Sequence, residues 1–450
     1  MDVIVSENSE ILHLMNIKEP VEEILKKMAD KAFSFPETVA DDNKKYKCSV
    51  FNYCYDNGSN VLIYNTLYNS LVRMEYEEYQ VYQTHRINES ADGKDFVNMG
   101  LWIEDDVDEM QRYLKFTQLY KTYITHDEMS LSITTTTKCN ARCPYCYENG
   151  IKQLDMYPGA VDKIYRLIEA KAVNKLVELT WFGGEPLMNT RVIDDLIDKL
   201  VENDFNFSSF FITNGSLFDD KLIEEKVDKW HVQSVQITLD GTKDVYEKRK
   251  NYINTEQGNF YNVLNNIRML AEKNIHVSIR INIDQQNRND VMQLLEQIDP
   301  IYSSFDNVVF YPAFVVGGAY SMSETEKLEC VREMLERISD VRKLMTGTNL
   351  YSMPRMNSCM KEEPNSYCVD VYGNIYNCEQ MVGRTENAIG TLEDIENLPD
   401  RIENKILEDE CKECVFFPKC YGGCIANKNA GDVACMIEKY IISAYMQIIF

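Results

Sequence analysis

Hydrophobic and polar positions alternate with two different periods along the middle of the chain. Short runs of apolar and β-branched residues predict strands at 131–137, 178–184, 209–215, 234–241, 276–283 and 307–314. Between them, apolar residues recur every three or four positions, which predicts helices at 157–173, 192–204, 218–229, 259–273, 289–298 and 323–342. Regular alternation of strands and helices predicts a parallel sheet covered by helices.

Six such units are fewer than the eight of a closed barrel. The fold class that we predict is therefore α/β, with a partial (β/α)6 TIM-like barrel at residues 126–345. Folds of this kind place their chemistry at the carboxyl ends of the strands.

The flanking segments have different patterns. Residues 1–125 open with a polar stretch that contains one amphipathic segment at 21–33. Short β-like runs follow at 47–55, 60–67 and 70–76, and then a helical, aromatic-rich tract. Residues 346–450 are rich in cysteine and turns and end in a helical tail. The pattern predicts a small N-terminal α/β module, the barrel, and a Cys-rich C-terminal domain.

Length and charge narrow the class of protein. The chain has 450 residues, which suits two or three domains. With 47 Lys and Arg against 72 Asp and Glu, its net charge is −25, which argues against nucleic acid or an anionic membrane as a partner. No apolar run is long enough to span a bilayer, and the first residues lack the pattern of a signal peptide. We expect a cytoplasmic protein.

Cysteine carries the candidate chemistry. The chain has 14 cysteines, and thiols stay reduced in an unexported protein, so clustered cysteines indicate metal or iron–sulfur ligands. Cys139, Cys143 and Cys146 form a C-x3-C-x2-C triplet directly after the first predicted strand. Three thiolates in one loop suit a [4Fe–4S] cube with one open iron. Zinc is the competing interpretation, although structural zinc sites usually have four protein ligands.

The triplet, with Tyr145 before its last cysteine, resembles the signature of the radical S-adenosylmethionine (SAM) enzymes. Gly183, Gly184, Glu185 and Pro186 at the end of the second strand match the GGEP motif of that family. The resemblance implies that the open iron binds SAM, and that its reductive cleavage gives a 5′-deoxyadenosyl radical. It also implies that Glu185 binds the amino group of SAM.

Other polar residues follow the third and fourth strands. The resemblance suggests SAM contacts for Asn214, Thr238, Asp240 and Arg249, and less strongly for two residues of the fifth strand, Arg280 and Asn282. A capping or turn role is the alternative for each of them.

A second group of cysteines lies near the C-terminus. Its order is C-x13-G-x4-C, then C-x2-C-x5-C-x3-C, then C, and it resembles the SPASM extension of radical SAM enzymes; a zinc ribbon is the alternative. The resemblance implies two auxiliary [4Fe–4S] clusters, and so three clusters in all. The first would be held by Cys359, Cys378 and Cys424, and the second by Cys411, Cys414, Cys420 and Cys435. Cys368 is either a further ligand of the first cluster or a strand residue.

The N-terminal module resembles the winged-helix-like recognition element of SPASM peptide maturases. That element binds the leader of a ribosomal precursor peptide, which adds a strand to an exposed sheet edge. The alternative is a packing cap on the barrel. We interpret Cys48, Cys54 and Cys330, and the five histidines, as structural residues.

These resemblances predict a radical SAM peptide maturase that crosslinks a precursor peptide. The expected link is a Cys sulfur-to-carbon thioether, as in sactipeptides or ranthipeptides, and a carbon–carbon link is also open. The second hypothesis is a sulfatase-maturase-like enzyme that forms formylglycine; that group has Asp where this chain has Glu379, a candidate catalytic carboxylate. A zinc-binding scaffold without catalysis is the third. We expect SAM as cofactor, and a flavodoxin or ferredoxin as electron donor.

Overall fold

The computed structural model describes residues 2–5, 40–41, 43–123, 128–146, 148–254, 259–315, 321–344, 354–355, 359–399, 407–424 and 435–448. The chain divides into two compact units. Unit 1 comprises Met1–Thr125, Gly347–Cys359 and Asn404–Phe450, and unit 2 comprises His126–Thr346 and Met360–Glu403. The amphipathic stretch predicted at 21–33 lies outside the described residues.

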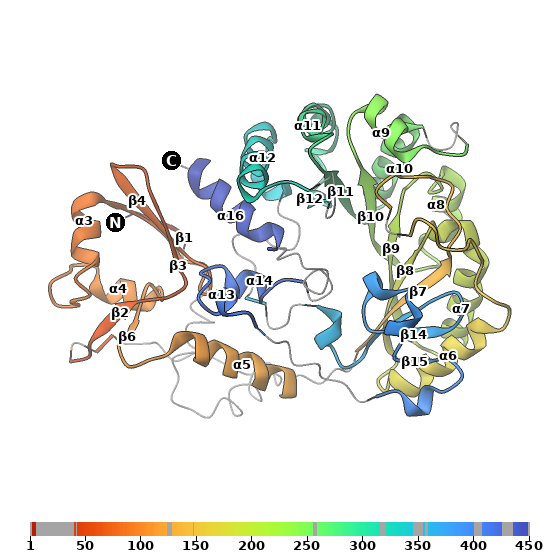
Figure 1. The fold of residues 1–450 in the computed structure, drawn as a ribbon, viewed down its shortest axis with the longest axis horizontal. Helices are drawn as coiled ribbons and strands as arrows, with labels where there is room; N and C mark the ends of the chain where they lie inside the picture. Colours follow the sequence, from red (N-terminus) through yellow and green to blue (C-terminus); the bar gives the residue numbers. More distant parts are fainter. Residues whose placement is uncertain are drawn as a thin grey trace. The chain divides into compact units, whose positions relative to one another are not determined.

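Unit 2 is built on one sheet. Its six central strands are β7 (Glu128–Thr136), β8 (Leu176–Gly183), β9 (Asn206–Thr213), β10 (Val232–Leu239), β11 (His276–Ile283) and β12 (Val308–Phe314). They are parallel and lie side by side in chain order. The predicted α/β fold with a central, mostly parallel sheet is thus confirmed, and all six predicted strands are present (Figure 1).

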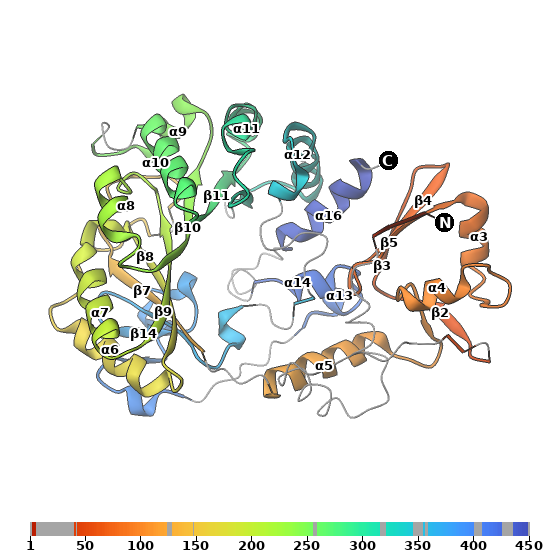
Figure 2. The same cartoon turned by 180° about the vertical axis from the view of Figure 1, so that it is seen from behind.

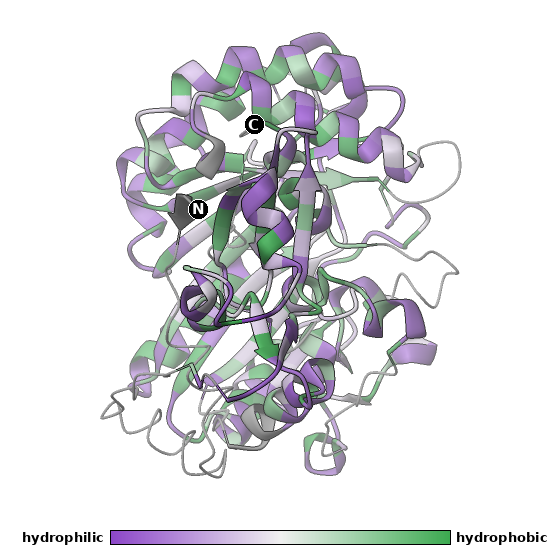
Figure 3. Ribbon diagram, turned by 90° about the vertical axis from the view of Figure 1, so that its left-hand side faces the viewer, coloured by the Kyte–Doolittle hydropathy of each residue, from purple (hydrophilic) through white to green (hydrophobic). Residues whose placement is uncertain are grey.

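Helices follow each of these strands and pack along the sheet, as both ribbon views show (Figures 1 and 2). They are α6 (Ala160–Lys171), α7 (Thr190–Glu202), α8 (Asp220–Lys226), α9 (Lys243–Lys250), α10 (Phe260–Glu272), α11 (Arg288–Tyr302) and α12 (Glu324–Arg337), with short 3-10 turns at Pro186–Asn189 and Val341–Leu344. Ile193, Leu196, Ile197 and Leu200 form the buried stripe of α7, which is the helical period read from the sequence. Figure 3 shows this alternation along the helices and strands.

Three short strands extend the sheet beyond β7. They are β13 (Ser366–Val369), β14 (Asn374–Tyr376) and β15 (Gly390–Thr391). Strand β13 runs parallel to β7 and places Cys368 opposite Ser132, whereas β14 and β15 are antiparallel. Single 3-10 turns lie at Met360–Glu362, Glu379–Met381, Thr385–Asn387 and Ile395–Asn397. The first part of the Cys-rich segment therefore belongs to the same sheet as the predicted barrel strands.

Unit 1 contains two small sheets. The first has the order β1-β5-β4-β3 and consists of β1 (Asp2–Val5), β5 (Leu71–Glu75), β4 (Asn60–Asn65) and β3 (Asn52–Asp56), all antiparallel. The second pairs β2 (Tyr46–Cys48) with β6 (Trp102–Glu104). Helices α3 (Tyr76–Tyr82), α4 (Gly93–Asn98) and α5 (Glu109–Tyr123) complete its N-terminal part.

The C-terminal residues of unit 1 pack onto this N-terminal part. They form α13 (Asp409–Lys412), α14 (Phe417–Cys420) and α16 (Ile437–Ile448). Phe51 and Tyr113 share a buried cluster with Phe417 and Tyr421, and the hydroxyl of Thr117 lies 2.9 Å from that of Tyr421. Residues 346–450 are thus divided between the two units. The division of the chain into three domains, at 1–125, 126–345 and 346–450, remains a prediction.

Some sequence predictions of local structure are wrong in detail. The run at 47–55 is two strands rather than one, because Ser49 turns the chain and donates its N–H to Leu101 at 3.0 Å. The tract expected to be helical contains β6, and α9 was not predicted. Helix α11 continues through Pro300 to Tyr302, which is buried and donates its hydroxyl to Leu264 at 2.7 Å, so packing outweighs the missing N–H of proline.

In the described part of the chain, no helix combines the length and the apolar character that a bilayer crossing requires.

Candidate active site

The loop that carries the cysteine triplet begins where β7 ends. Cys139, Cys143 and Cys146 are all half-buried. Burial raises the pKa of Cys139 to about 11, and the charges of Glu185, Cys143 and Cys146 act in the same direction. The N–H of Cys146 donates to the carbonyl of Cys143 at 3.2 Å, which folds the loop back on itself. The structure therefore brings the three thiols within electrostatic reach of one another.

The donor set fits an iron–sulfur cube. Its three half-buried thiols lie in one loop, and in a cube each thiolate binds a different iron. The N–H of Ala141 donates to Cys139 Sγ at 3.4 Å, and such bonds favour a thiolate ligand. Cys139, Cys143 and Cys146 would hold the cluster.

Gly183 and Gly184 allow the end of β8 to lie directly against this loop. A Cβ atom on Gly183 would meet the carbonyl oxygen of Thr136 at 2.3 Å, and one on Gly184 would meet that of Lys138 at 2.5 Å. The N–H groups of Gly184 and Glu185 donate to the same two carbonyls at 3.0 and 2.9 Å. The glycines therefore serve the contact between two strand ends, whatever ligand also lies near them.

Glu185 is completely buried at the ends of β8 and β9. Its carboxylate accepts hydrogen bonds from the hydroxyl of Thr213 at 2.8 Å, from the N–H of Asn214 at 2.9 Å and from that of Leu187 at 3.3 Å. Burial raises its pKa to about 7, against the effect of these donors. In this structure Glu185 binds protein donors and fixes the edge of the predicted SAM site.

Asn214 belongs to a closed network beside the cysteine loop. Its Nδ2 donates to Asn140 Oδ1 at 2.8 Å, Asn140 Nδ2 donates to Ser216 Oγ at 2.9 Å, and Ser216 Oγ donates to Asn214 Oδ1 at 2.6 Å. Asn140 directly follows Cys139, so this network ties the loop to the end of β9.

Tyr145 ties the same loop to the end of β10. Its hydroxyl donates to Asp240 Oδ2 at 2.6 Å, and Lys250 Nζ lies 3.1 Å from the same oxygen. Burial lowers the pKa of Lys250, but the carboxylate of Asp240, together with Tyr145, Cys143 and Tyr246, keeps it above its ordinary value. Asp240 Oδ1 is buried with no hydrogen-bond partner among the described residues, which leaves one acceptor for a ligand.

Arg249 lies next to this network. Its guanidinium donates to Asp284 at 2.6 Å and lies over the ring of Tyr145, 5.0 Å from the ring centre. Its Nε atom is buried and has no partner in the part of the chain that the structure describes. Thr238 lies on β10 opposite Arg280 of β11, and the side chain of Arg280 donates to Asn282 at 3.0 Å.

Two important residues were missed from the sequence. Lys250 is buried, whereas a lysine is usually exposed; the one signal in the sequence is its place directly after Arg249. Ser132 was read as an ordinary strand residue. Its hydroxyl donates to Glu379, which comes from far along the chain.

Glu379 and two of the predicted auxiliary ligands meet beside β7. The side chain of Cys368 is fully buried and lies 3.7 Å from the sulfur of Met360. Burial raises the pKa of Cys368, and the charges of Glu379 and Cys378 add to this effect. Burial also raises the pKa of Glu379, while the hydroxyl of Ser132 lowers it.

The remaining predicted ligands belong to unit 1. Burial raises the pKa of Cys414, and so do the charges of Cys435 and Cys411, so these three thiols lie near one another. Lys439 Nζ donates to Cys435 Sγ at 3.8 Å. Cys359, Cys420 and Cys424 are half-buried.

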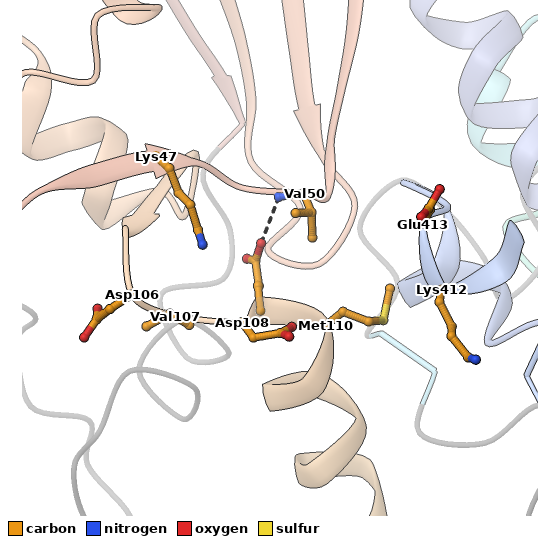
Figure 4. Close-up of a pocket in the computed structure, with 9 residues that line it drawn as sticks. Lys47, Val50, Asp106, Val107, Asp108, Met110, Lys412 and Glu413 are labelled. Atoms are coloured by element: carbon orange, nitrogen blue, oxygen red, sulfur yellow. Dashed lines mark hydrogen bonds between the residues drawn. The ribbon is translucent and has the colours of Figure 1, made fainter. Parts of the chain in front are cut away.

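Two cavities accompany these sites. One, of about 640 Å³, lies in unit 2 between the end of the cysteine loop at Glu148–Lys152 and the turn at Asp370–Asn374. The other, of about 490 Å³, lies in unit 1 at the start of α5, between Lys47, Asp106 and Lys412 (Figure 4). Glu109 borders it and accepts the N–H of Val50 at 3.0 Å, the bond drawn in Figure 4.

Part of the chain is similar in sequence to radical SAM proteins. Residues 133–298 match the family model described as the radical SAM superfamily. The radical SAM cyclopropyl synthase TigE of Paramaledivibacter caminithermalis is 25% identical over 222 residues, which cover 45% of this chain and 45% of that protein. This match therefore spans less than half of that relative.

Two further relatives have maturation in their names. The sporulation killing factor maturation protein SkfB of Bacillus subtilis is 25% identical over 172 residues, 38% of this chain and 39% of that protein. The cysteine-type anaerobic sulfatase-maturating enzyme of Clostridium novyi is 21% identical over 332 residues, 65% of this chain and 86% of that protein. Among solved structures, anSMEcpe with bound AdoMet and Kp18Cys peptide is similar to this chain, with a TM-score of 0.54 at 16% identity. The similarity covers 71% of this chain and 95% of that one, and it indicates that the two share a fold.

Proposed function

This chain contains a radical SAM domain, and we propose that it is a peptide maturase that installs a crosslink, specifically a Cys sulfur-to-carbon thioether, in a ribosomally synthesised precursor. The observation that carries the proposal is the convergence of Cys139, Cys143 and Cys146 at the end of β7, next to the ends of β8, β9 and β10. In an α/β sheet this edge is where chemistry is placed.

The residues of the chain have distinct roles in this proposal. The triplet holds a [4Fe–4S] cluster, which together with SAM supplies one-electron chemistry for removing hydrogen from unactivated C–H bonds. Asp240 Oδ1 and Arg249 Nε are buried polar atoms at this edge with no partner among the described residues, and they would bind the polar groups of SAM. Glu185, Asn214 and Tyr145 keep the strand ends in register with the cysteine loop.

A peptide substrate is supported by the relatives. Two of them are a cyclopropyl synthase and a maturation protein, and anSMEcpe has been solved with a bound peptide. In unit 1, β3 is one of the two edge strands of its sheet, the other being β1, and an edge strand is where a further strand can be added. We assign residues 1–125 as the winged-helix-like module that binds the leader there.

The C-terminal cysteines would hold two auxiliary clusters in a SPASM domain. Cys359, Cys378 and Cys424, with Cys368 as a further ligand, form the first set, and Cys411, Cys414, Cys420 and Cys435 form the second. The mutual effects of Cys411, Cys414 and Cys435 on the pKa of Cys414 support the second set. Three clusters imply an electron donor such as a flavodoxin or ferredoxin.

A sulfatase-maturase-like activity is the second candidate. It is favoured by the Clostridium novyi relative, whose length is covered to 86%, and by Glu379, a half-buried carboxylate beside two predicted auxiliary ligands. In that reaction Glu379 would take the proton from a Ser or Cys of the substrate as that residue is oxidised to formylglycine.

Mass spectrometry separates the two functions. The anaerobically reconstituted chain would be incubated with SAM, a reductant and a Cys-containing peptide encoded beside its gene. Loss of one pair of hydrogen atoms per link, with fragmentation blocked between two residues, supports the crosslinking maturase. Deoxyadenosine release with an unchanged peptide rejects that substrate, and conversion of a sulfatase-type Ser or Cys peptide supports the alternative. No deoxyadenosine release with either peptide contradicts both.

A further inference from the structure

A cysteine and a histidine outside the predicted cluster sites meet in unit 1. Cys48 Sγ lies 3.0 Å from His85 Nε2, although the two residues are 37 positions apart. Cys48 is the last residue of β2, and His85 follows α3. Both residues are half-buried, so part of each is exposed to solvent.

The histidine is held by its backbone and by a neighbouring ring. His85 has a φ of 55°, in the left-handed region that few non-glycine residues adopt. Its ring packs edge-on against Trp102, with ring centres 5.9 Å apart, and Trp102 is itself buried. The turn after α3 and the indole together direct the imidazole toward the sulfur of Cys48.

The thiol has a second contact that leaves its proton available to the imidazole. Tyr82 Oη lies 3.3 Å from Cys48 Sγ. It donates to the carbonyl of Leu101 at 3.3 Å and accepts from Asn52 Nδ2 at 2.9 Å. Because the phenol proton is directed to a carbonyl, the thiol proton has two acceptors, the phenol oxygen and the neutral imidazole. A thiol within hydrogen-bond reach of an oriented base is the arrangement of an activated nucleophile.

The surrounding groups favour an uncharged resting pair. Burial raises the pKa of Cys48, although the phenol of Tyr82 lowers it. Burial lowers the pKa of His85, and Asp105 acts in the opposite direction. The other titratable groups near the sulfur are the thiol of Cys54 and the phenol of Tyr79. His85 is therefore neutral near pH 7 and able to accept a proton.

We propose that Cys48 and His85 form a thiol–disulfide exchange site whose substrate is a small disulfide, such as that of a cellular thiol. His85 Nε2 accepts the proton of Cys48 as the sulfur attacks one sulfur of the disulfide. The new S–S bond joins Cys48 to one half of the substrate, and the old S–S bond breaks. The leaving thiolate takes the proton from the imidazolium, so the electrons and protons balance without a further oxidant.

Two other cysteines serve as controls within the same molecule. Cys54 is exposed and its sulfur lies 4.0 Å from the carbonyl of Asn52. Cys330 is fully buried, and burial raises its pKa to about 12. If accessibility alone decided reactivity, Cys54 would react first; if the imidazole decides it, Cys48 would.

The experiment uses the full chain with its clusters reconstituted under anaerobic conditions. It would be incubated with glutathione disulfide across a range of pH, and each cysteine adduct would be located and timed by peptide mapping. We expect the first glutathione on Cys48, ahead of Cys54 and Cys330. His85→Asn keeps a side chain that tolerates the left-handed backbone but removes the base, and should slow the reaction at Cys48 by about tenfold or more.

The pH dependence distinguishes a base from a structural histidine. In the unchanged chain the rate at Cys48 should level off once His85 is neutral, whereas in His85→Asn it should keep rising with pH as the thiol ionises. The rate at Cys54 should be the same in both proteins, which shows that the variant is folded. First labelling of Cys54 in the unchanged chain overturns the proposal without any variant, as does an unaltered rate at Cys48 in His85→Asn.

Discussion

The hydroxyl of Tyr145 donates a 2.6 Å hydrogen bond to the carboxylate of Asp240, and so joins the cysteine loop to the carboxyl end of β10. Lys250, from the last turn of α9, completes the contact at 3.1 Å from the same carboxylate oxygen. The side chains of Lys250 and Asp240 are 3% and 0% exposed, so neither charge is solvated. The cysteine loop, the end of β10 and the last turn of α9 are thus held together by the carboxylate of Asp240.

Lys250→Met should destabilise unit 2 strongly, because it leaves the charge of Asp240 buried and unpaired. Losing one partner of a buried pair costs roughly 3–5 kcal/mol of the free energy of unfolding. Urea unfolding followed by the fluorescence of Trp181 and Trp230 measures this. The double variant Asp240→Asn with Lys250→Met should recover part of the loss.

Arg268→Ala is the matched control for that measurement. Arg268 pairs with Glu272, and both side chains are about half exposed, at 49% and 51%. Exposed pairs of this kind contribute up to about 1 kcal/mol. Equal losses for Lys250→Met and Arg268→Ala would contradict the importance of the buried pair.

The fold of unit 2 could be predicted because its signals are local. The alternating residues of His276–Ile283 gave the bounds of β11 as the structure has them, since one face of that strand packs in the core. The cysteine triplet was visible because its members lie within eight positions and directly follow β7.

Contacts that depend on tertiary structure could not be predicted. The sequence indicates only structural roles for Cys48 and His85, and the fold of unit 1 brings Cys48 Sγ and His85 Nε2 to 3.0 Å. Strand β6 has three residues, which are too few to show the alternation of apolar and polar residues that marks a strand. Cys368 lies opposite Ser132 because β13 adds to β7, and no pattern in either segment indicates which strands will pair.

Gly184→Ala should reduce cluster content. The added Cβ would lie 2.5 Å from the carbonyl oxygen of Lys138, so the loop before Cys139 must move, at a cost of roughly 1–3 kcal/mol. Iron bound per chain after reconstitution is the measurement. Gly150→Ala is the control, because that residue has a φ of 91° but open space around it. Full iron content in Gly184→Ala would show that the close approach is dispensable.

Replacing Cys139, Cys143 and Cys146 by Ala should abolish deoxyadenosine release, because all three thiolates are needed for one cube. The readouts are deoxyadenosine by chromatography and the visible absorption of the reconstituted protein. A variant with Ala at Cys54 and Cys330 should keep both signals. Deoxyadenosine release from the triple variant would refute the assignment of these ligands.

Glu109 should make unit 1 less stable as the pH rises. Burial raises its pKa to about 7 from an ordinary value of 4.5, against the hydrogen bonds from Ser49 and Val50. The folded chain thus binds this proton more tightly than the unfolded chain. The stability it contributes is complete below pH 4.5 and is lost as the pH rises through 7, by roughly 3 kcal/mol.

Glu109→Gln should remove this dependence. The free energy of urea unfolding, followed by the fluorescence of Trp102, should fall between pH 4.5 and 8 by roughly 3 kcal/mol more in the unchanged chain than in the variant. Glu77→Gln changes an exposed residue of α3. Its free energy of unfolding should fall between pH 4.5 and 8 by as much as that of the unchanged chain. If the free energy of unfolding had the same pH dependence in the unchanged chain and in Glu109→Gln, the raised pKa of Glu109 would be contradicted.

Glu379→Gln should slow the formation of the peptide product without slowing the release of deoxyadenosine. Glu379 accepts the hydroxyl of Ser132 and lies beside Cys368. If it removes a proton from the peptide, the amide should keep deoxyadenosine release but form product about 100-fold more slowly. Glu386→Gln makes the same change at an exposed position and should leave both rates unchanged. Because a misfolded site would lose both activities, retained deoxyadenosine release distinguishes a lost base from a damaged structure, and an unaltered product rate would exclude Glu379 from the chemistry.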